Sequence, residues 1–240
     1  MKTWALLVLM TTSLFYVNCS NNEQKKLGEA QACLDKAGDN SSAASACLTY
    51  LEGLSSTKVD AMKCSIKFVA GGITTTRLIN AIKQINDGQN KQDVFISILV
   101  FNGKPAATGA QAITNVNDAA ADCNASQVEG LQYLANFAVA GTVLIKAFND
   151  AGGTVDWNDP SGNVTNISSA DLTTAVSNCA SGTNCDTTTV GSAIISLSDS
   201  YCNGANATSS QCQQVNAALA AGGSDPAAVG QEFFNQISQP

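Results

Sequence analysis

The chain contains no histidine among its 240 residues. Histidine is the usual general base near neutral pH, and it belongs to the Ser-His-Asp and Cys-His arrangements of nucleophilic catalysis. The GxSxG, GxGxxG and P-loop motifs are absent as well. A hydrolase with paired carboxylates needs no histidine, but the acidic residues here are scattered without a pattern. We therefore predict that the protein is not an enzyme and has no catalytic residue.

Charged side chains are scarce, at 13% of the chain, which is about half the usual share. Residues 105–240 contain one basic side chain, Lys146, and eleven acidic ones, a net charge of −10. Residues 19–104 carry a net charge of +2, so the acidity belongs to the second half. Nucleic-acid binding depends on Lys and Arg side chains that neutralise phosphates. This charge distribution therefore argues against a nucleic-acid partner.

Metal-ligand patterns are missing too. There is no CxxC and no histidine, which argues against a structural zinc site. The loop sequence "DWNDPSGN" has the composition of a calcium site, but its sixth position is Ser161 instead of Gly and its twelfth is Ile167 instead of Glu. We expect a turn-rich surface loop, with Trp157 packed against the core, and no metal or cofactor. The oxygen donors of that loop are Asp156, Asn158, Asp159, Ser161 and Asn163.

An export signal is present at the N-terminus, "MKTWALLVLMTTSLFYVNC". Lys2 supplies the positive region, and the apolar run that follows is shorter than the roughly 20 residues of a membrane span. One possibility is cleavage after Cys19 by a general signal peptidase. The other is a relaxed bacterial lipobox with Tyr16 at −3 and Asn18 at −1, which makes a lipidated Cys19 the first residue. We predict the second, with a signal peptide at 1–18, a lipidated tether at 19–26 and a single helical domain at 27–240.

Nine cysteines are an odd number, and removing Cys19 leaves an even set of eight. An even set in an exported chain indicates a disulfide framework. Eight cysteines allow 105 pairings, so the sequence does not determine the connectivity. Spacing across short loops favours three pairs, and the two remaining cysteines would close a long loop. In that order the candidates are Cys179 with Cys185, Cys202 with Cys212, Cys33 with Cys47, and Cys64 with Cys123.

Apolar residues recur every three or four positions over most of the chain, which is the helical period. The pattern predicts helices over 27–37, from a cap at Asn40 or Ser41, from Thr57 to the "AGG" at 70–72, and from Thr76 towards Ile85. Further helices are predicted near 170–179, 187–201 and 209–220, and a last one is capped by Ser224 or Asp225.

Two apolar segments allow more than one interpretation. The stretch "DVFISILVF" could be a buried strand, but no second run of similar quality could pair with it, so we predict a core helix. Residues 127–148 could cross a membrane, but their uninterrupted apolar run is short, and we predict a central bundle helix. Residues 150–168 form the clearest loop. Together these patterns predict an all-α, disulfide-stabilised helical bundle that follows a cleaved N-terminal lipoprotein signal peptide.

Three further stretches resemble a family of leptospiral (spirochaete) lipoproteins of unassigned function. They are "KFVAGGITTTRLINAIKQI", "YLANFAVAGTVL" and "SYCNGANATSSQCQQVNAALAAGG". The polar "SNNEQKK" after Cys19 is similar to the short tether of such proteins. The resemblance covers the layout of the chain and implies no active residue. It implies a location in the cell envelope, at the outer membrane or cell surface, with the membrane as partner through the lipid.

Three functions remain open at this point. The first is a structural or interaction protein of the envelope, with an unidentified protein partner. The second is a carrier of a small apolar ligand, whose pocket would be lined by Phe68, Phe95, Phe101, Phe137 or Phe148. The third is a secreted, glycosylated protein cleaved after Cys19, for which N-glycosylation motifs begin at Asn40, Asn124, Asn163, Asn166 and Asn206.

Overall fold

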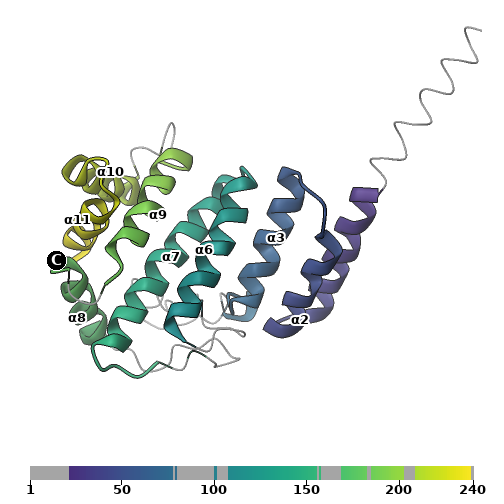
Figure 1. Ribbon diagram of the computed structural model, residues 1–240, viewed down its shortest axis with the longest axis horizontal. Coiled ribbons are helices and arrows are strands. Elements are labelled where there is room, and N and C mark those ends of the chain that lie inside the picture. Colours follow the sequence, from purple (N-terminus) through teal and green to yellow (C-terminus); the bar gives the residue numbers. More distant parts are fainter. Residues whose placement is uncertain are drawn as a thin grey trace, which may run out of the picture.

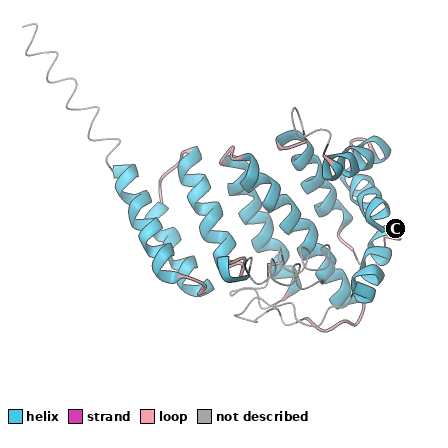
Figure 2. Cartoon of the chain, turned by 180° about the vertical axis from the view of Figure 1, so that it is seen from behind, coloured by secondary structure: helices cyan, strands magenta, loops and turns pink. Residues whose placement is uncertain are grey.

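The computed structural model describes residues 22–77, 79, 100–101, 108–155, 157, 169–182, 185–202 and 209–238. These residues form helices and connecting turns, and no strand is found among them (Figure 2). The all-α, disulfide-stabilised fold is therefore confirmed. In chain order the elements are a helix at 22–37, α2 (Ser41–Ala46), the 3₁₀ helix η1 (Cys47–Leu51), α3 (Thr57–Ala70), α6 (Gly109–Ala125), α7 (Glu129–Asp150), α8 (Ser169–Ala180), α9 (Thr187–Ser200), α10 (Ser210–Gly222) and α11 (Pro226–Ser238).

The helices lie side by side in a row (Figure 1). Helix 22–37 is at one end of the row, and α10 and α11 are at the other, near the C-terminus. Between these ends α2 packs on α3, α3 on α6, α6 on α7, α7 on α9, and α9 on α11. Each described helix therefore contacts a neighbour along the row, and the two ends of the protein are far apart.

Short polar side chains begin many of these helices. The side chains of Asn40, Ser56, Thr108, Asp186 and Ser209 each accept a hydrogen bond from the backbone N–H three residues later. Such caps satisfy N–H groups that have no partner inside the helix. The cap predicted at Asn40 is confirmed, whereas α3 is capped by Ser56, one residue before the predicted Thr57.

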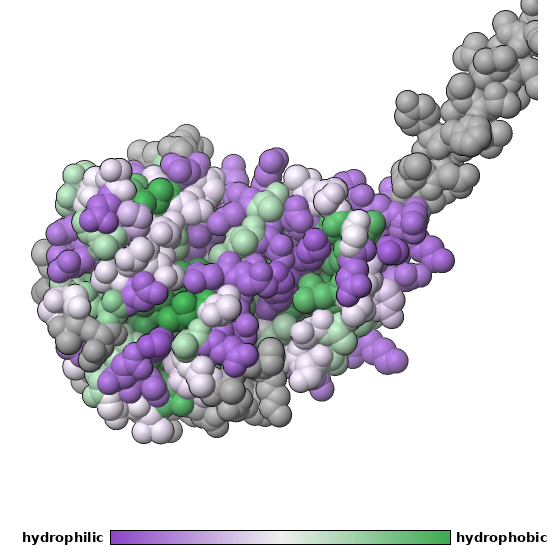
Figure 3. All heavy atoms as spheres, viewed as in Figure 1, coloured by the Kyte–Doolittle hydropathy of each residue, from purple (hydrophilic) through white to green (hydrophobic). Residues whose placement is uncertain are grey.

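Three hydrophobic clusters form the core, and shared helices connect them. Helix α3 directs Val59 and Ile66 into the cluster with helix 22–37, and Cys64 and Phe68 into the next cluster. This division follows from the helical period. Val59 and Ile66 are seven residues apart and lie on one face of α3, and Cys64 and Phe68 are four residues apart and lie on a different face. We number the clusters along the row from helix 22–37, so that the second contains Cys64 and the third contains Trp157. Helix α7 likewise contributes to the second and third clusters. Figure 3 shows a mainly polar exterior, with hydrophobic side chains in small separate groups.

Two observations differ from the sequence predictions. Helix α6 was not predicted, because its buried face is built largely of small residues, Ala112, Ala119 and Ala120 among them, which give a weak hydrophobic signal. The first helix begins at residue 22 instead of 27, so residues 22–26 of the predicted tether at 19–26 are helical.

The remaining helix predictions either agree with the structure or fall mostly outside the described residues. Helices α8, α9, α10 and α11 agree with their predicted positions to within a few residues. Residues 75–77 are helical, but most of the helix predicted towards Ile85 lies outside the described residues. Most of "DVFISILVF" also lies outside them. Its last two residues, Val100 and Phe101, are buried and belong to no helix or strand.

Candidate functional site

The predicted attachment residue, Cys19, lies outside the described residues, but the structure accounts for the other eight cysteines. They form the four disulfides that their spacing favours, so the disulfide prediction is confirmed. No cysteine of this chain is left to pair with Cys19. The pairs are Cys33–Cys47, Cys64–Cys123, Cys179–Cys185 and Cys202–Cys212, with Cα–Cα distances of 5.7, 4.9, 4.9 and 5.3 Å.

The first helix is attached to the body close to its beginning. The hydroxyl of Ser56 donates a hydrogen bond of 2.8 Å to the Oε1 atom of Glu23. This bond joins the first turn of helix 22–37 to the segment before α3. Further along, the Cys33–Cys47 disulfide joins the helix to η1. The chain is therefore held to the body from three or four residues after Cys19.

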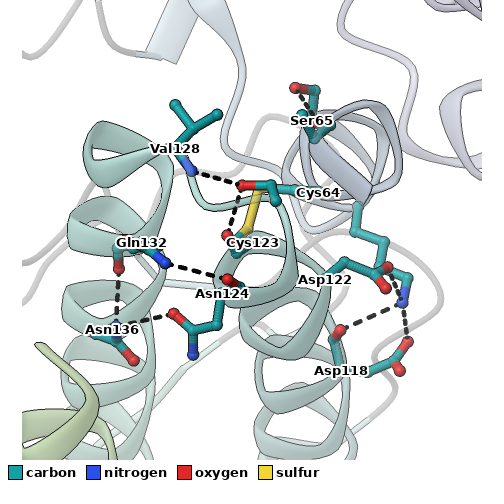
Figure 4. The surroundings of a disulfide bond; sticks show 12 residues. Cys64, Ser65, Asp118, Asp122, Cys123, Asn124, Val128, Gln132 and Asn136 are labelled. Atoms are coloured by element: carbon teal, nitrogen blue, oxygen red, sulfur yellow. Dashed lines mark hydrogen bonds and ion pairs between the residues drawn. A yellow bond between two sulfur atoms is a disulfide. The ribbon is translucent and has the colours of Figure 1, made fainter. Parts of the chain in front are cut away.

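The Cys64–Cys123 disulfide joins two neighbouring helices in the middle of the row, α3 and α6 (Figure 4). Both cysteines are fully buried. The bond links residues 59 positions apart, whereas the other three disulfides link residues at most 14 positions apart. This disulfide is therefore the long-range covalent link between the N-terminal helices and the rest of the row.

On one side of this disulfide, Lys67 of α3 contacts two carboxylates of α6. Its Nζ atom is 2.6 Å from Asp118 Oδ2 and 2.6 Å from the buried Asp122 Oδ2, and it donates to the Asp118 carbonyl at 3.2 Å. Burial alone would lower the pKa of Lys67, but the hydrogen bonds and charges of the two carboxylates outweigh it and raise the pKa. The lysine is therefore held in its charged form, as a clamp between helices and not as a nucleophile.

On the other side, amide side chains join α6 to α7 (Figure 4). The Nδ2 atom of the buried Asn136 donates to Asn124 Oδ1 at 3.3 Å and to the Gln132 carbonyl at 2.9 Å. The Gln132 side chain donates to the Asn124 carbonyl at 3.0 Å. These bonds satisfy polar groups at the turn between the helices. The groups around the disulfide thus bond to one another, which is the arrangement of a structural junction.

Four of the phenylalanines proposed for a carrier pocket are described, and they pack in or against the hydrophobic core. The rings of Phe68 and Phe101 pack edge to face at 5.7 Å in the second cluster. Phe148 packs against the third cluster, and Phe137 contacts both clusters. Phe95 lies outside the described residues. Three of the four described rings thus belong to or pack against the second cluster, and Phe148 packs against the third.

The loop after α7 is described only in part. The proposed oxygen donors Asp156, Asn158, Asp159, Ser161 and Asn163 lie outside the described residues. Trp157 is 7% exposed and packs in the third cluster, which confirms the predicted contact with the core. The indole lies against Gly109, where a Cβ atom would be 3.0 Å from the ring. In the parts of the chain that are described, no three His, Cys, Asp or Glu side chains are grouped so that they could hold a metal ion.

Helix α7 is the one described helix that is long and apolar enough to cross a membrane. Of its most apolar 18-residue window, 67% is buried inside the protein. The helix packs against α6, α8 and α9. It therefore occupies the central position that the sequence predicts for it.

Comparison with known proteins gives no assignment, since no family model, no curated protein and no solved structure matches this chain.

Proposed function

We propose that the protein is a bacterial lipoprotein of the cell envelope, held at the outer membrane or cell surface by a diacylglyceryl group on Cys19. Its helical row would serve a structural or interaction role. The observation that carries the proposal is the cysteine pairing, because all eight cysteines after Cys19 pair with one another. A lone cysteine directly after an apolar signal run is the expected acceptor of a lipid.

The position of the first helix supports this assignment. A lipid anchor requires that the N-terminal end of the body lie at its outside. Helix 22–37 meets this requirement, because it starts at the end of the row away from the C-terminus. Two or more acyl chains give stable membrane attachment, so the lipid alone suffices to hold the body. The resemblance to leptospiral lipoproteins is consistent with the same location.

The test is the mass of the mature N-terminal peptide, after expression in a bacterium that processes lipoproteins. We expect Cys19 as the first residue, carrying diacylglycerol and an amide-linked acyl chain. The Cys19→Ala variant should lose this mass and leave the membrane fraction. The matched control is the double variant Cys179→Ser with Cys185→Ser, which removes two other cysteines and should remain lipidated.

An N-terminus at Ser20 in the wild-type protein would overturn the proposal in favour of the secreted alternative. Of the N-glycosylation motifs that this alternative requires, the structure describes two acceptor residues. Asn40 is the exposed cap of α2, and Asn124 accepts a hydrogen bond from Asn136 at its Oδ1 atom. The apolar-ligand carrier is the weaker candidate, because Phe68 and Phe101 are buried in the core with their rings packed on each other, and Phe148 packs in another cluster.

A further inference from the structure

One long edge of the row contains the start of helix 22–37. The same edge, the upper one in Figure 1, carries the segment between η1 and α3 and the turn between α6 and α7. The hydrogen bond from Ser56 to Glu23 joins the first two of these directly. We call this the attachment edge and define it by residues 22–25, 50–56, 126–133 and 199–202.

The tyrosines are concentrated on this edge. The chain has four, and the three that follow the signal run are Tyr50, Tyr133 and Tyr201. Tyr50 lies in η1, directly before the segment that leads to α3, and is 40% exposed. Tyr133 lies near the start of α7, and its half-buried ring is 4.6 Å from that of Tyr201 at the end of α9. Tyr133 and Tyr201 therefore lie at helix ends on the attachment edge, and Tyr50 lies near the end of η1, from which the chain runs to that edge.

An exposed aliphatic side chain lies on the same edge. Val128, in the turn between α6 and α7, is 45% exposed. Among the described residues, the other large hydrophobic side chain that is strongly exposed is that of Ile79, which is outside this edge. Ile79 lies two residues after Arg77. The guanidinium of Arg77 donates to the Gly72 carbonyl, just beyond the C-terminal end of α3, which is the end opposite to the attachment edge. Tyrosine has an apolar ring and a polar hydroxyl, and it is enriched where a membrane meets water.

The chain between the proposed anchor and the body is short. Two residues lie between Cys19 and residue 22, and the three steps from one residue to the next span at most about 11 Å when fully extended. If Cys19 carries the lipid, the first turn of helix 22–37 must lie within that distance of the bilayer. A tether of this length keeps the edge at a high effective concentration at the membrane, so weak contacts are sufficient to orient the body.

We propose that the attachment edge lies on the bilayer surface, with Tyr50 and Val128 in the headgroup region. This inference rests on the lipid anchor proposed above and deepens it. Acidic groups at the opposite ends of the helices then face away from the membrane: Asp150 ends α7, Asp186 caps α9, and Asp225 precedes α11. The attachment edge itself carries four carboxylates, those of Glu23, Glu52, Glu129 and Asp199, and one lysine, Lys25. The contact is therefore made with zwitterionic lipid, and anionic lipid should weaken it.

Tryptophan quenching by brominated lipid tests this orientation. The lipidated protein is placed in vesicles of phosphatidylcholine and phosphatidylethanolamine, with a brominated fraction. The mature chain has one tryptophan, the buried Trp157, which gives a constant background. The variants are Tyr50→Trp and Val128→Trp. The control is Ala151→Trp, an exposed position at the other end of α7, about 33 Å from residue 128.

We expect bromine to quench the added tryptophan at 50 and at 128 at least about twofold more than at 151. Equal quenching at 128 and 151 would overturn the inference, and so would quenching at 50 alone, since the row would then stand on its end. Iodination of the wild-type protein checks the result without substitution. Tyr50 should be protected in the vesicles compared with the Cys19→Ala protein mixed with the same vesicles, and equal labelling would contradict the contact.

The mass of the N-terminal peptide in the same sample separates the two proposals. A lipidated Cys19 without quenching at 128 overturns the membrane contact and leaves the lipoprotein assignment intact. An N-terminus at Ser20 overturns both.

Discussion

The Lys67 ammonium shows how a single side chain holds two helices of the row together. Its contacts with Asp118 and Asp122 join α3 to α6 beside the buried disulfide. The side chains of Lys67 and Asp122 are only 18% and 20% exposed, so removing the lysine would leave a carboxylate poorly solvated. The cost of such a change comes mainly from the uncompensated charge that remains.

The first prediction concerns the pH dependence of this ion pair. Lys67→Met should lower the free energy of unfolding by about 2 kcal/mol at pH 7. The pKa of Lys67 is raised in the folded protein above its ordinary value of about 10.4, so its contribution is complete below that pH and is lost as the pH rises through the folded value. Urea unfolding from pH 8 to pH 12 should show the gap between wild type and variant closing.

A matched control is Lys25→Met, which removes a lysine that is 75% exposed and paired loosely with Glu29 at 3.9 Å. It should change the stability by less than about 0.5 kcal/mol at every pH. Burial and the neighbouring Tyr201 raise the pKa of Tyr133, which also weakens the fold at high pH, but this effect is common to wild type and variant. A gap that stays constant up to pH 12 would contradict the clamp.

At the scale of the elements, α9 and α11 make a close contact through glycines. A Cβ atom added to Gly191 of α9 would overlap the Pro226 carbonyl, and one added to Gly230 of α11 would overlap the Thr187 carbonyl. The two helices therefore approach backbone to backbone, and glycine is required on both. The absence of a side chain at both positions allows this close approach, while larger residues of α11 such as Phe233 and Phe234 are buried elsewhere along the helix.

The second prediction follows from this contact. Gly191→Ala and Gly230→Ala should each destabilise the protein by about 3 kcal/mol or more, because backbone atoms cannot move aside as a side chain can. Thermal unfolding measures the loss.

Gly130→Ala is the corresponding control. It lies in the first turn of α7, and a Cβ atom there would meet nothing within 4 Å. Because alanine favours the helix over glycine, this variant should be neutral or more stable by up to about 1 kcal/mol. Equal tolerance of alanine at positions 130, 191 and 230 would contradict the close packing.

At the scale of the whole molecule, the row depends on links between neighbours, because its ends do not contact each other. The three core clusters are continuous only through shared helices. The Cys64–Cys123 disulfide crosses the boundary between the N-terminal helices and the rest. Three of the four disulfides link residues that are close in the chain, whereas this one links helices α3 and α6 across the row.

The third prediction compares the disulfides by loop length. A disulfide restricts the unfolded chain more when it closes a longer loop, and the separations here are 59 residues for Cys64–Cys123 and 6 for Cys179–Cys185. Replacing the first pair by alanine should cost about 4 kcal/mol, and replacing the second about 2 kcal/mol. Urea unfolding of the two double variants measures the difference. Equal losses would show that strain or residual structure outweighs loop closure.

The sequence by itself determined the features that depend on neighbours along the chain. Helix starts follow from caps such as Asn40 and Asp225, whose side chains bond backbone groups two or three residues away. The odd number of cysteines separated Cys19 from the framework, and short loops between cysteines indicated their partners. These signals are local, so no knowledge of the folded shape is needed to read them.

Only the tertiary structure decided what depends on packing between distant segments. Helix α6 buries mostly small residues, and its place became visible only through its contacts with α3 and α7. The glycine contact of α9 with α11 and the ion pair of Lys67 join residues 35 to 55 positions apart. Tyr133 and Tyr201 meet because α7 begins, and α9 ends, on the same side of the row. Such coincidences depend on how helices are stacked, and the spacing of residues in one helix does not encode them.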